Sequence, residues 1–192
     1  MNIAMARKAP SLLLMVRVVL GLLSAAATPL HAGESSKPSA GVAAPELTGD
    51  AWLNLPKGTQ LSLASRKGKV TVLHFWTYGC INCKHNLPAY ERWQKRFAAK
   101  GVVVIGIHSP ETQAERNPDN VAKMVKELGI IYPVLLDSDL KNWNRWQQRV
   151  WPAVCLIDKQ CRARYGWEGE LEYRGAGGEA KLTGLIEALL KE

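Results

Sequence analysis

Residues 70–88 of the chain, VTVLHFWTYGCINCKHNLP, decide its fold. They begin as a run of β-branched and aromatic residues typical of a buried strand, pass a turn at residues 77–79 and enter a helical pattern. Cys80 lies at the start of this helix, where free backbone N–H groups and the helix dipole favour a thiolate. Cys83 follows one helical turn later, so it can resolve a mixed disulfide by attacking Cys80. The pattern indicates a redox-active dithiol.

Two other roles for this Cys-x-x-Cys pair receive less support. A zinc site would need a second pair of ligands, and the spacing of Cys155 and Cys161 is a poor match to such a site. A purely structural disulfide would close so short a loop that it would constrain the unfolded chain little. We expect Cys155 and Cys161 to be free thiols or small buried side chains, because Cys161 would face Asp158 across a tight hairpin.

The first 32 residues have the pattern of a secretory signal peptide. Arg7, Lys8 and Arg17 supply positive charge, and an apolar run over residues 18–27 precedes a small-residue site that ends at Ala32. The run is short for a membrane span, so we expect cleavage after Ala32 and no integral membrane span in the mature form. Export would place the dithiol in the periplasm, where a reductase needs an electron donor in the envelope or the membrane.

The composition is that of one globular domain with appendages. The chain has 192 residues, of which 47% are hydrophobic, and this is enough for a substantial core. Loss of the three basic residues of the signal would lower the formal net charge from +8 to +5. The remaining basic residues alternate with acidic ones, which predicts a solvated surface and no nucleic-acid partner. We expect a monomer.

Segments rich in glycine and proline, together with the periodicity of apolar residues, divide the rest of the chain into expected elements. Residues 33–44, rich in Ser, Gly, Pro and Ala, are expected to be a flexible linker, and residues 45–192 the folded domain. Residues 52–55 and 61–63 are expected to pair as a short amino-terminal hairpin. Strands alternate with helices and end in a second hairpin, which favours an α/β fold with a central mixed sheet flanked by helices. The expected helices are 81–99, 117–128, a short one within 137–146 and one through 182–189. The expected strands are 70–76, 102–107, 132–136, 153–157 and 162–167.

Further motifs surround the dithiol. They are Phe75-Trp76 before Gly79, Pro88 five residues after Cys83, Trp151-Pro152, and Asp158-Lys159 at the end of a strand. Together they resemble the thioredoxin superfamily, in its exported TlpA-like or redoxin branch. The strings around Cys80 and Ile107 look most like the thioredoxin-like domain of DipZ-type membrane proteins. The resemblance covers about residues 44–190 and implies a thiol–disulfide oxidoreductase that acts on protein disulfides. Such an enzyme needs no metal or organic cofactor, because its dithiol carries two electrons.

The resemblance also implies a substrate groove beside the dithiol. It implies a cis peptide bond between Trp151 and Pro152, with the proline facing the cysteines. Trp76, which precedes the turn, and Tyr78, which lies within it, are assigned to substrate binding as well. His108 follows the strand 102–107, so it is expected either to line the site or to cap a loop.

His74 occupies the position where thioredoxin has a buried acid beneath the active site. One hypothesis makes it a catalytic residue that accepts the proton of Cys83, through water, near neutral pH. The other, at least as well supported, makes it a core histidine on a central strand. Gly79 and the Ile81-Asn82 pair depart from thioredoxin itself. The reduction potential therefore does not carry over, and reduction, oxidation and isomerisation all stay open.

Two other functions remain as alternatives. A peroxiredoxin-like peroxidase would need a Pro-x-x-x-Thr-x-x-Cys setting, which the residues before Cys80 lack. A copper-binding redox module would use Cys80, Cys83 and His108, although copper-delivery relatives usually space their cysteines by three residues. The sequence therefore predicts an exported enzyme that reduces or exchanges protein disulfides through its Cys-Ile-Asn-Cys dithiol.

Overall fold

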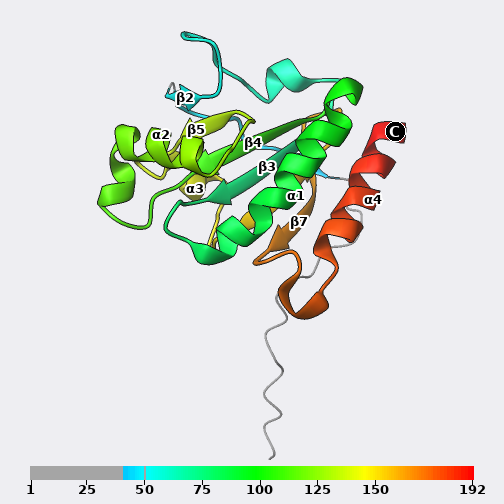
Figure 1. Cartoon of the computed structure of the whole chain (residues 1–192). Helices are drawn as coiled ribbons and strands as arrows, with labels where there is room; N and C mark the ends of the chain where they lie inside the picture. Colours follow the sequence, from blue (N-terminus) through cyan, green and yellow to red (C-terminus); the bar gives the residue numbers. More distant parts are fainter. Residues whose placement is uncertain (1–40, 50) are drawn as a thin grey trace, which may run out of the picture. The chain divides into compact units, whose positions relative to one another are not determined.

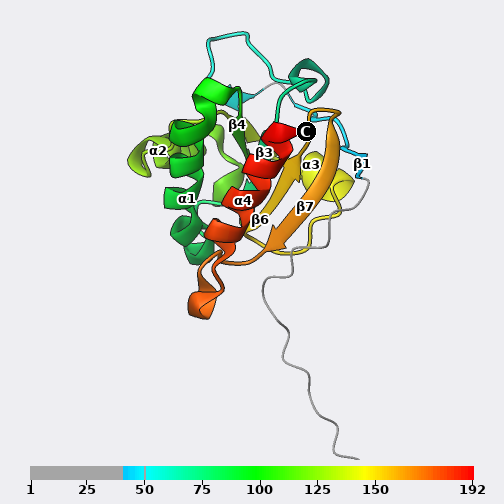
Figure 2. The same cartoon turned by 90° about the vertical axis from the view of Figure 1, so that its right-hand side faces the viewer.

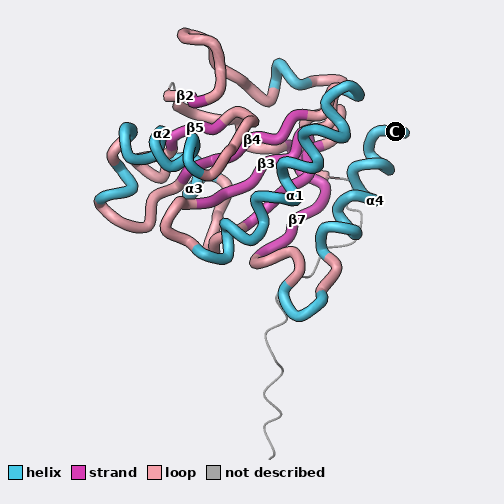
Figure 3. The backbone as a smooth tube through the Cα atoms, viewed as in Figure 1, coloured by secondary structure: helices cyan, strands magenta, loops and turns pink. Residues whose placement is uncertain are grey.

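Residues 41–49 and 51–192 are described by a computed structural model of the chain (Figures 1 and 3). The expected signal peptide and residues 33–40 of the expected linker lie outside the described residues. Residues 42 and 43 already form a strand, β1, that pairs with β7, so the sheet begins before residue 45. Within the described residues, no helix combines the length and the apolar character needed to cross a membrane.

The described strands form one mixed sheet in the order β1-β7-β6-β3-β4-β5-β2. The central strand β3 pairs in parallel with β4 and antiparallel with β6, and β4 pairs in parallel with β5. β6 and β7 form the expected carboxy-terminal hairpin. The strands are β1 (Val42–Ala43), β2 (Trp52–Leu53), β3 (Thr71–Trp76), β4 (Val103–His108), β5 (Val134–Leu136), β6 (Ala153–Ile157) and β7 (Arg162–Glu168).

Helices cover both faces of this sheet (Figure 2). α1, α2 and α4 pack on one face, and α3 packs on the other together with the segment that leads into β3. Pro88 lies inside α1, and Asn117 caps α2 by accepting the N–H of Asp119. The α-helices are α1 (Ile81–Phe97), α2 (Pro118–Glu127), α3 (Lys141–Arg145) and α4 (Gly178–Lys191). Single 3-10 turns span Ala64–Arg66, Ala98–Lys100, Ala114–Arg116 and Tyr173–Gly175.

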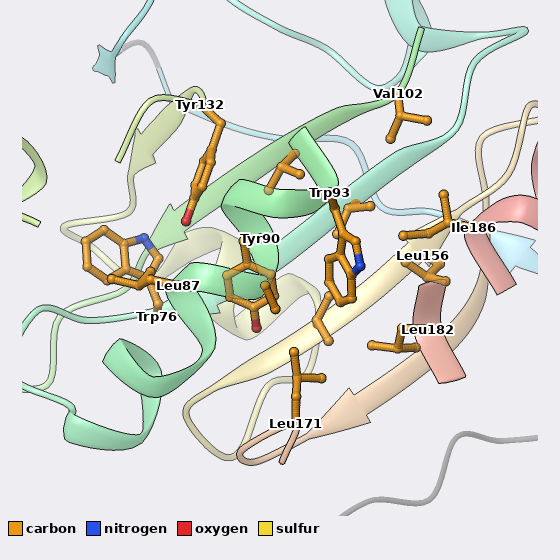
Figure 4. Packing of buried hydrophobic residues seen from close by; sticks show 14 of the residues in the cluster. Trp76, Leu87, Tyr90, Trp93, Val102, Tyr132, Leu156, Leu171, Leu182 and Ile186 are labelled. Carbon is orange, nitrogen blue, oxygen red and sulfur yellow. The ribbon is translucent and has the colours of Figure 1, made fainter. Parts of the chain in front are cut away.

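The core divides between the two faces because side chains alternate along each strand. Along β3, Val72 and Trp76 join the cluster under α1, whereas Leu73 and Phe75 join the cluster on the α3 side. Figure 4 shows the first cluster, in which Tyr90 and Trp93 of α1 point toward the sheet and Leu182 and Ile186 extend from α4. Every residue of β3 is buried, as expected for a central strand covered on both faces.

The expected amino-terminal hairpin is wrong. Trp52 of β2 pairs with Leu135 at the far edge of the sheet, and residues 61–63 form no strand. Leu63 is buried on the α3 side, so its apolar character reflects packing and not strand pairing. The carboxylate of Glu46 accepts the N–H groups of Leu63 and Ala64, at 2.6 and 3.0 Å, and so replaces the partner that a strand would supply.

Candidate active site

Cys80 and Cys83 differ sharply in their surroundings. Cys80 is the N-cap of α1, is partly exposed, and its Sγ accepts the N–H of Cys83 at 3.1 Å. Cys83 is fully buried, and burial together with the Cys80 hydrogen bond raises the pKa of its thiol far above the ordinary range. Ile81, between them, is 60% exposed. One sulfur is therefore open to a substrate over the free end of a helix, and the other is protected behind it.

His108 supports the turn that precedes Cys80. Its Nε2 lies 3.4 Å from the backbone N of Tyr78 and 3.4 Å from Oγ1 of Thr77. Its ring stacks on Tyr78 at 5.6 Å and meets the edge of Trp76 at 5.2 Å. Burial lowers the pKa of His108 to about 4, so the imidazole is neutral at pH 7 and can accept the Tyr78 N–H. The loop-capping hypothesis for His108 is the one that fits.

Three residues assigned to substrate binding are buried, namely Trp76, His108 and Pro152. Trp76 is 0% exposed and His108 is 1% exposed. Burial of Trp76 and His108 beneath the turn argues against direct contact with a polypeptide that approaches Cys80. Tyr78 and Trp151 remain partly exposed and can make such a contact.

The Trp151–Pro152 peptide bond is cis, as the resemblance implies. The indole N–H of Trp151 donates to the carbonyl oxygen of Ser109 at 3.1 Å, and its ring stacks on Trp143 at 4.0 Å. Pro152 is buried, and its carbonyl oxygen accepts the N–H of Gly169 at 2.7 Å. Two hydrogen bonds and one ring stacking contact therefore fix the position of this segment.

Asp137 anchors the supports of Trp151, and sequence analysis missed it. Its buried carboxylate accepts the Ser109 hydroxyl and the Trp143 N–H, each at 2.9 Å. It also accepts the backbone N–H and the side-chain amide of Asn142, at 2.8 and 3.1 Å. Both residues that contact the Trp151 indole are thus fixed by one carboxylate.

Asn86 connects the cysteine helix to the proline segment, and it too was missed. Its amide nitrogen donates to the carbonyl oxygen of Gly169 at 3.1 Å, and its oxygen accepts the N–H of Leu171 at 2.8 Å. The N–H of Gly169 in turn donates to Pro152. A polar residue within the buried stripe of α1, one turn after Cys83, was the only sign in the sequence.

His74 is a buried core residue. It is 0% exposed, its ring stacks on Tyr90 at 4.0 Å, and neither ring nitrogen has a hydrogen-bond partner in the described part of the chain. Burial lowers the pKa of His74 to about 3, which disfavours the imidazolium that a proton acceptor would form. Burial and stacking favour the interpretation of His74 as a core residue, and its role as a proton acceptor stays a prediction.

These two neutral imidazoles should make the fold sensitive to acid. Their pKa values, about 3 for His74 and about 4 for His108, lie below the ordinary 6.5 of an unfolded chain. Below pH 6.5 the unfolded chain binds protons that the fold does not, so stability falls as the pH falls toward 4. In this window, each imidazole should lower the free energy of unfolding by about 1.4 kcal/mol for each pH unit of acidification.

Urea unfolding at pH 7, 6 and 5 measures the slope of the free energy of unfolding against pH. His74→Leu should halve it while leaving the resolution of mixed disulfides, followed by stopped flow, at the wild-type rate. An unchanged slope would contradict the neutral buried imidazole. Slower resolution in the folded variant would instead support the proton-acceptor role.

Comparisons with known proteins agree with this geometry. The AhpC/TSA family model matches residues 40–165. The chain belongs to the AhpC/TSA family. Protein DipZ of Mycobacterium bovis is 41% identical to it over 131 residues, which make up 68% of this chain and 19% of DipZ. The chain thus spans about a fifth of the length of that curated relative.

In two further comparisons, the match covers most of the length of the other protein. Thiol-disulfide oxidoreductase YkuV of Bacillus subtilis is 29% identical over 135 residues, which make up 70% of this chain and 83% of YkuV. The solved structure of thioredoxin-like superfamily protein SPOA0173 has a TM-score of 0.68 at 29% identity, and the match covers 78% of this chain and 96% of that one. The predicted thioredoxin-like fold is thereby confirmed.

Proposed function

We propose that this AhpC/TSA family member is an exported thiol–disulfide oxidoreductase that reduces or exchanges protein disulfides through Cys80 and Cys83. The observation that carries the proposal is the difference in exposure between the two cysteines. Cys80 is partly exposed at the amino end of α1, and Cys83 is buried one turn later. The family and the name of the relative YkuV support this class of enzyme.

The proposed reaction has two steps. The Cys80 thiolate attacks one sulfur of a substrate disulfide, forming a mixed disulfide and releasing the other substrate sulfur as a thiolate. Cys83 then loses its proton and attacks Cys80, which breaks the mixed disulfide and releases the second substrate thiolate. Two electrons pass to the substrate, and the enzyme ends with a Cys80–Cys83 disulfide.

The substrate surface would lie around Cys80. Tyr78 and Trp151 are partly exposed there, and Ile81 and Val150 are 60% and 39% exposed. We propose that these side chains contact the substrate chain beside the Trp151–Pro152 bond. A copper site on the cysteines and His108 has less support, since no group of three or more potential metal ligands occurs among the described residues.

A single-turnover assay tests the activity. Reduced protein, freed of dithiothreitol and mixed with insulin, should lose about 2 Da per chain as the Cys80–Cys83 disulfide forms and one insulin disulfide is reduced. Peptide mapping identifies the new disulfide. Failure to reduce insulin, with rapid oxidation by hydrogen peroxide, would favour the peroxidase alternative.

The cellular setting is also part of the proposal. We propose that residues 1–32 are a cleaved signal peptide, that a linker follows, and that the enzyme works in the periplasm as a monomer without a membrane span. An envelope or membrane protein would then supply its electrons, because the compartment is oxidising. The signal pattern of the sequence supports this setting.

The export proposal predicts a mature protein that starts at or near Gly33. Mass spectrometry of protein purified from the cell envelope measures the amino terminus directly. We expect the amino-terminal peptide to begin at residue 33, after the small-residue site. Recovery of residues 1–32 in the purified protein would reject cleavage.

A further inference from the structure

A buried carboxylate holds the turn that carries the dithiol. Glu115, in the 3-10 turn before α2, is 2% exposed. Its Oε1 accepts the N–H of Gly79 at 2.8 Å. Its Oε2 accepts the N–H groups of Glu111 and Thr112, both at 2.8 Å, and the Thr112 hydroxyl at 3.1 Å. One side chain therefore joins the turn before α1 to the loop after β4.

The close approach of Glu115 explains the glycine in this turn. A Cβ on residue 79 would lie 2.6 Å from Oε1 of Glu115, closer than atoms approach in real structures. Gly79 is not among the residues with positive φ, so its backbone conformation does not require glycine. The missing side chain at this position is thus the space that the carboxylate occupies.

The same contacts keep Glu115 ionised. Burial alone would raise the pKa of the carboxyl group. Hydrogen bonds from the Thr77 hydroxyl and from the N–H groups of Thr112, Gly79 and Glu111 outweigh burial and lower the pKa below its ordinary value. A fixed negative charge is therefore bonded to Gly79, the residue before Cys80, beside the amino end of α1.

We propose that Glu115 is a positioning residue that also lowers the reduction potential of the Cys80/Cys83 dithiol, and this rests on the redox function proposed above. The carboxylate opposes the attraction between the helix end and a thiolate. A thiolate can form only in the reduced pair, whereas the disulfide carries no charge. The charge therefore disfavours the reduced state and makes the dithiol a stronger reductant.

Glu115→Gln tests the proposal, because it keeps the side-chain length and removes the charge. The reduction potential of the Cys80/Cys83 pair is measured by equilibrating the protein in buffers of reduced and oxidised glutathione. Removal of the charge should increase the equilibrium constant for reduction of the dithiol by glutathione about three- to tenfold, which is a rise of about 15 to 30 mV. Gly79→Ala displaces the same carboxylate by its Cβ and should raise the potential too.

Glu127→Gln is the matched control, because Glu127 is an exposed carboxylate of α2 that pairs with Lys123 at 3.8 Å. Its loss should leave the potential unchanged. An unchanged potential in folded Glu115→Gln, or an equal rise in Glu127→Gln, overturns the proposal. If Glu115→Gln does not fold, an unchanged potential in Gly79→Ala overturns it. Failure of the proposed function would show separately, as a wild-type protein that exchanges no protein disulfides although its potential is measurable.

Discussion

Cys80→Ser should abolish disulfide reduction, and Cys83→Ser should instead trap the substrate. Cys80 is the sulfur that a substrate can reach, so its loss removes the chemical step and should lower insulin reduction by a factor on the order of 10³ or more. Cys83→Ser keeps the attacking sulfur and removes the resolving one. Covalent complexes with substrate proteins should therefore accumulate and disappear on addition of dithiothreitol.

The chain offers its own controls for this experiment. Cys155→Ser and Cys161→Ser should both keep wild-type rates, because the two thiols are unpaired and burial raises the pKa of Cys155 to about 12. Non-reducing gels of envelope extracts reveal the complexes, and mass spectrometry identifies the trapped partners. Adducts that accumulate in Cys80→Ser would reverse the two roles. Wild-type exchange in both active-site variants would reject the dithiol mechanism.

Asp137→Ala should be among the most destabilising substitutions outside the dithiol. The change leaves the Ser109 hydroxyl, two donors of Asn142 and the Trp143 N–H without their shared acceptor. We expect the free energy of unfolding to fall by about 3 to 5 kcal/mol, since several buried donors lose one charged partner. Substrate binding should weaken as well, because Ser109 and Trp143 hold the Trp151 indole.

Asp139→Ala is the control for the Asp137 substitution. Asp139 lies two residues further on, pairs with exposed Lys141, and its own side chain is 55% exposed. Its loss should change the free energy of unfolding by no more than about 0.5 kcal/mol. Urea unfolding measures both variants, and the KM for insulin measures the second effect. Equal stabilities of the two variants would show that the Asp137 hydrogen bonds matter little.

The sequence predicts the parts of this fold that local periodicity determines. The central strand β3, the helix α1 that follows it and the β6–β7 hairpin occur as expected, because each has a clear apolar pattern and clear turn residues. The position of the dithiol at the start of α1 follows from the same patterns. The cis bond before Pro152 came only from the resemblance, since sequence physics favours neither isomer strongly enough.

Two of the missed residues have partners that lie far away in the sequence. Glu115 binds Gly79 across 36 residues, and Asn86 binds Gly169 across 83. No local pattern identifies the distant partner of such a residue, because its contact depends on how the chain folds. The amino-terminal hairpin failed for a related reason, as Leu63 alternates like a strand residue but is buried by packing against the α3 side of the sheet.

The two residues between the cysteines contribute almost nothing to the packing of the domain. Ile81 and Asn82 are both exposed, whereas the fold around them is secured by Cys83, Asn86 and the residues buried beneath α1. Substitutions at these two positions should therefore leave the fold unchanged. Libraries that vary only these two positions should yield a graded series of enzymes with different driving forces on one unchanged scaffold.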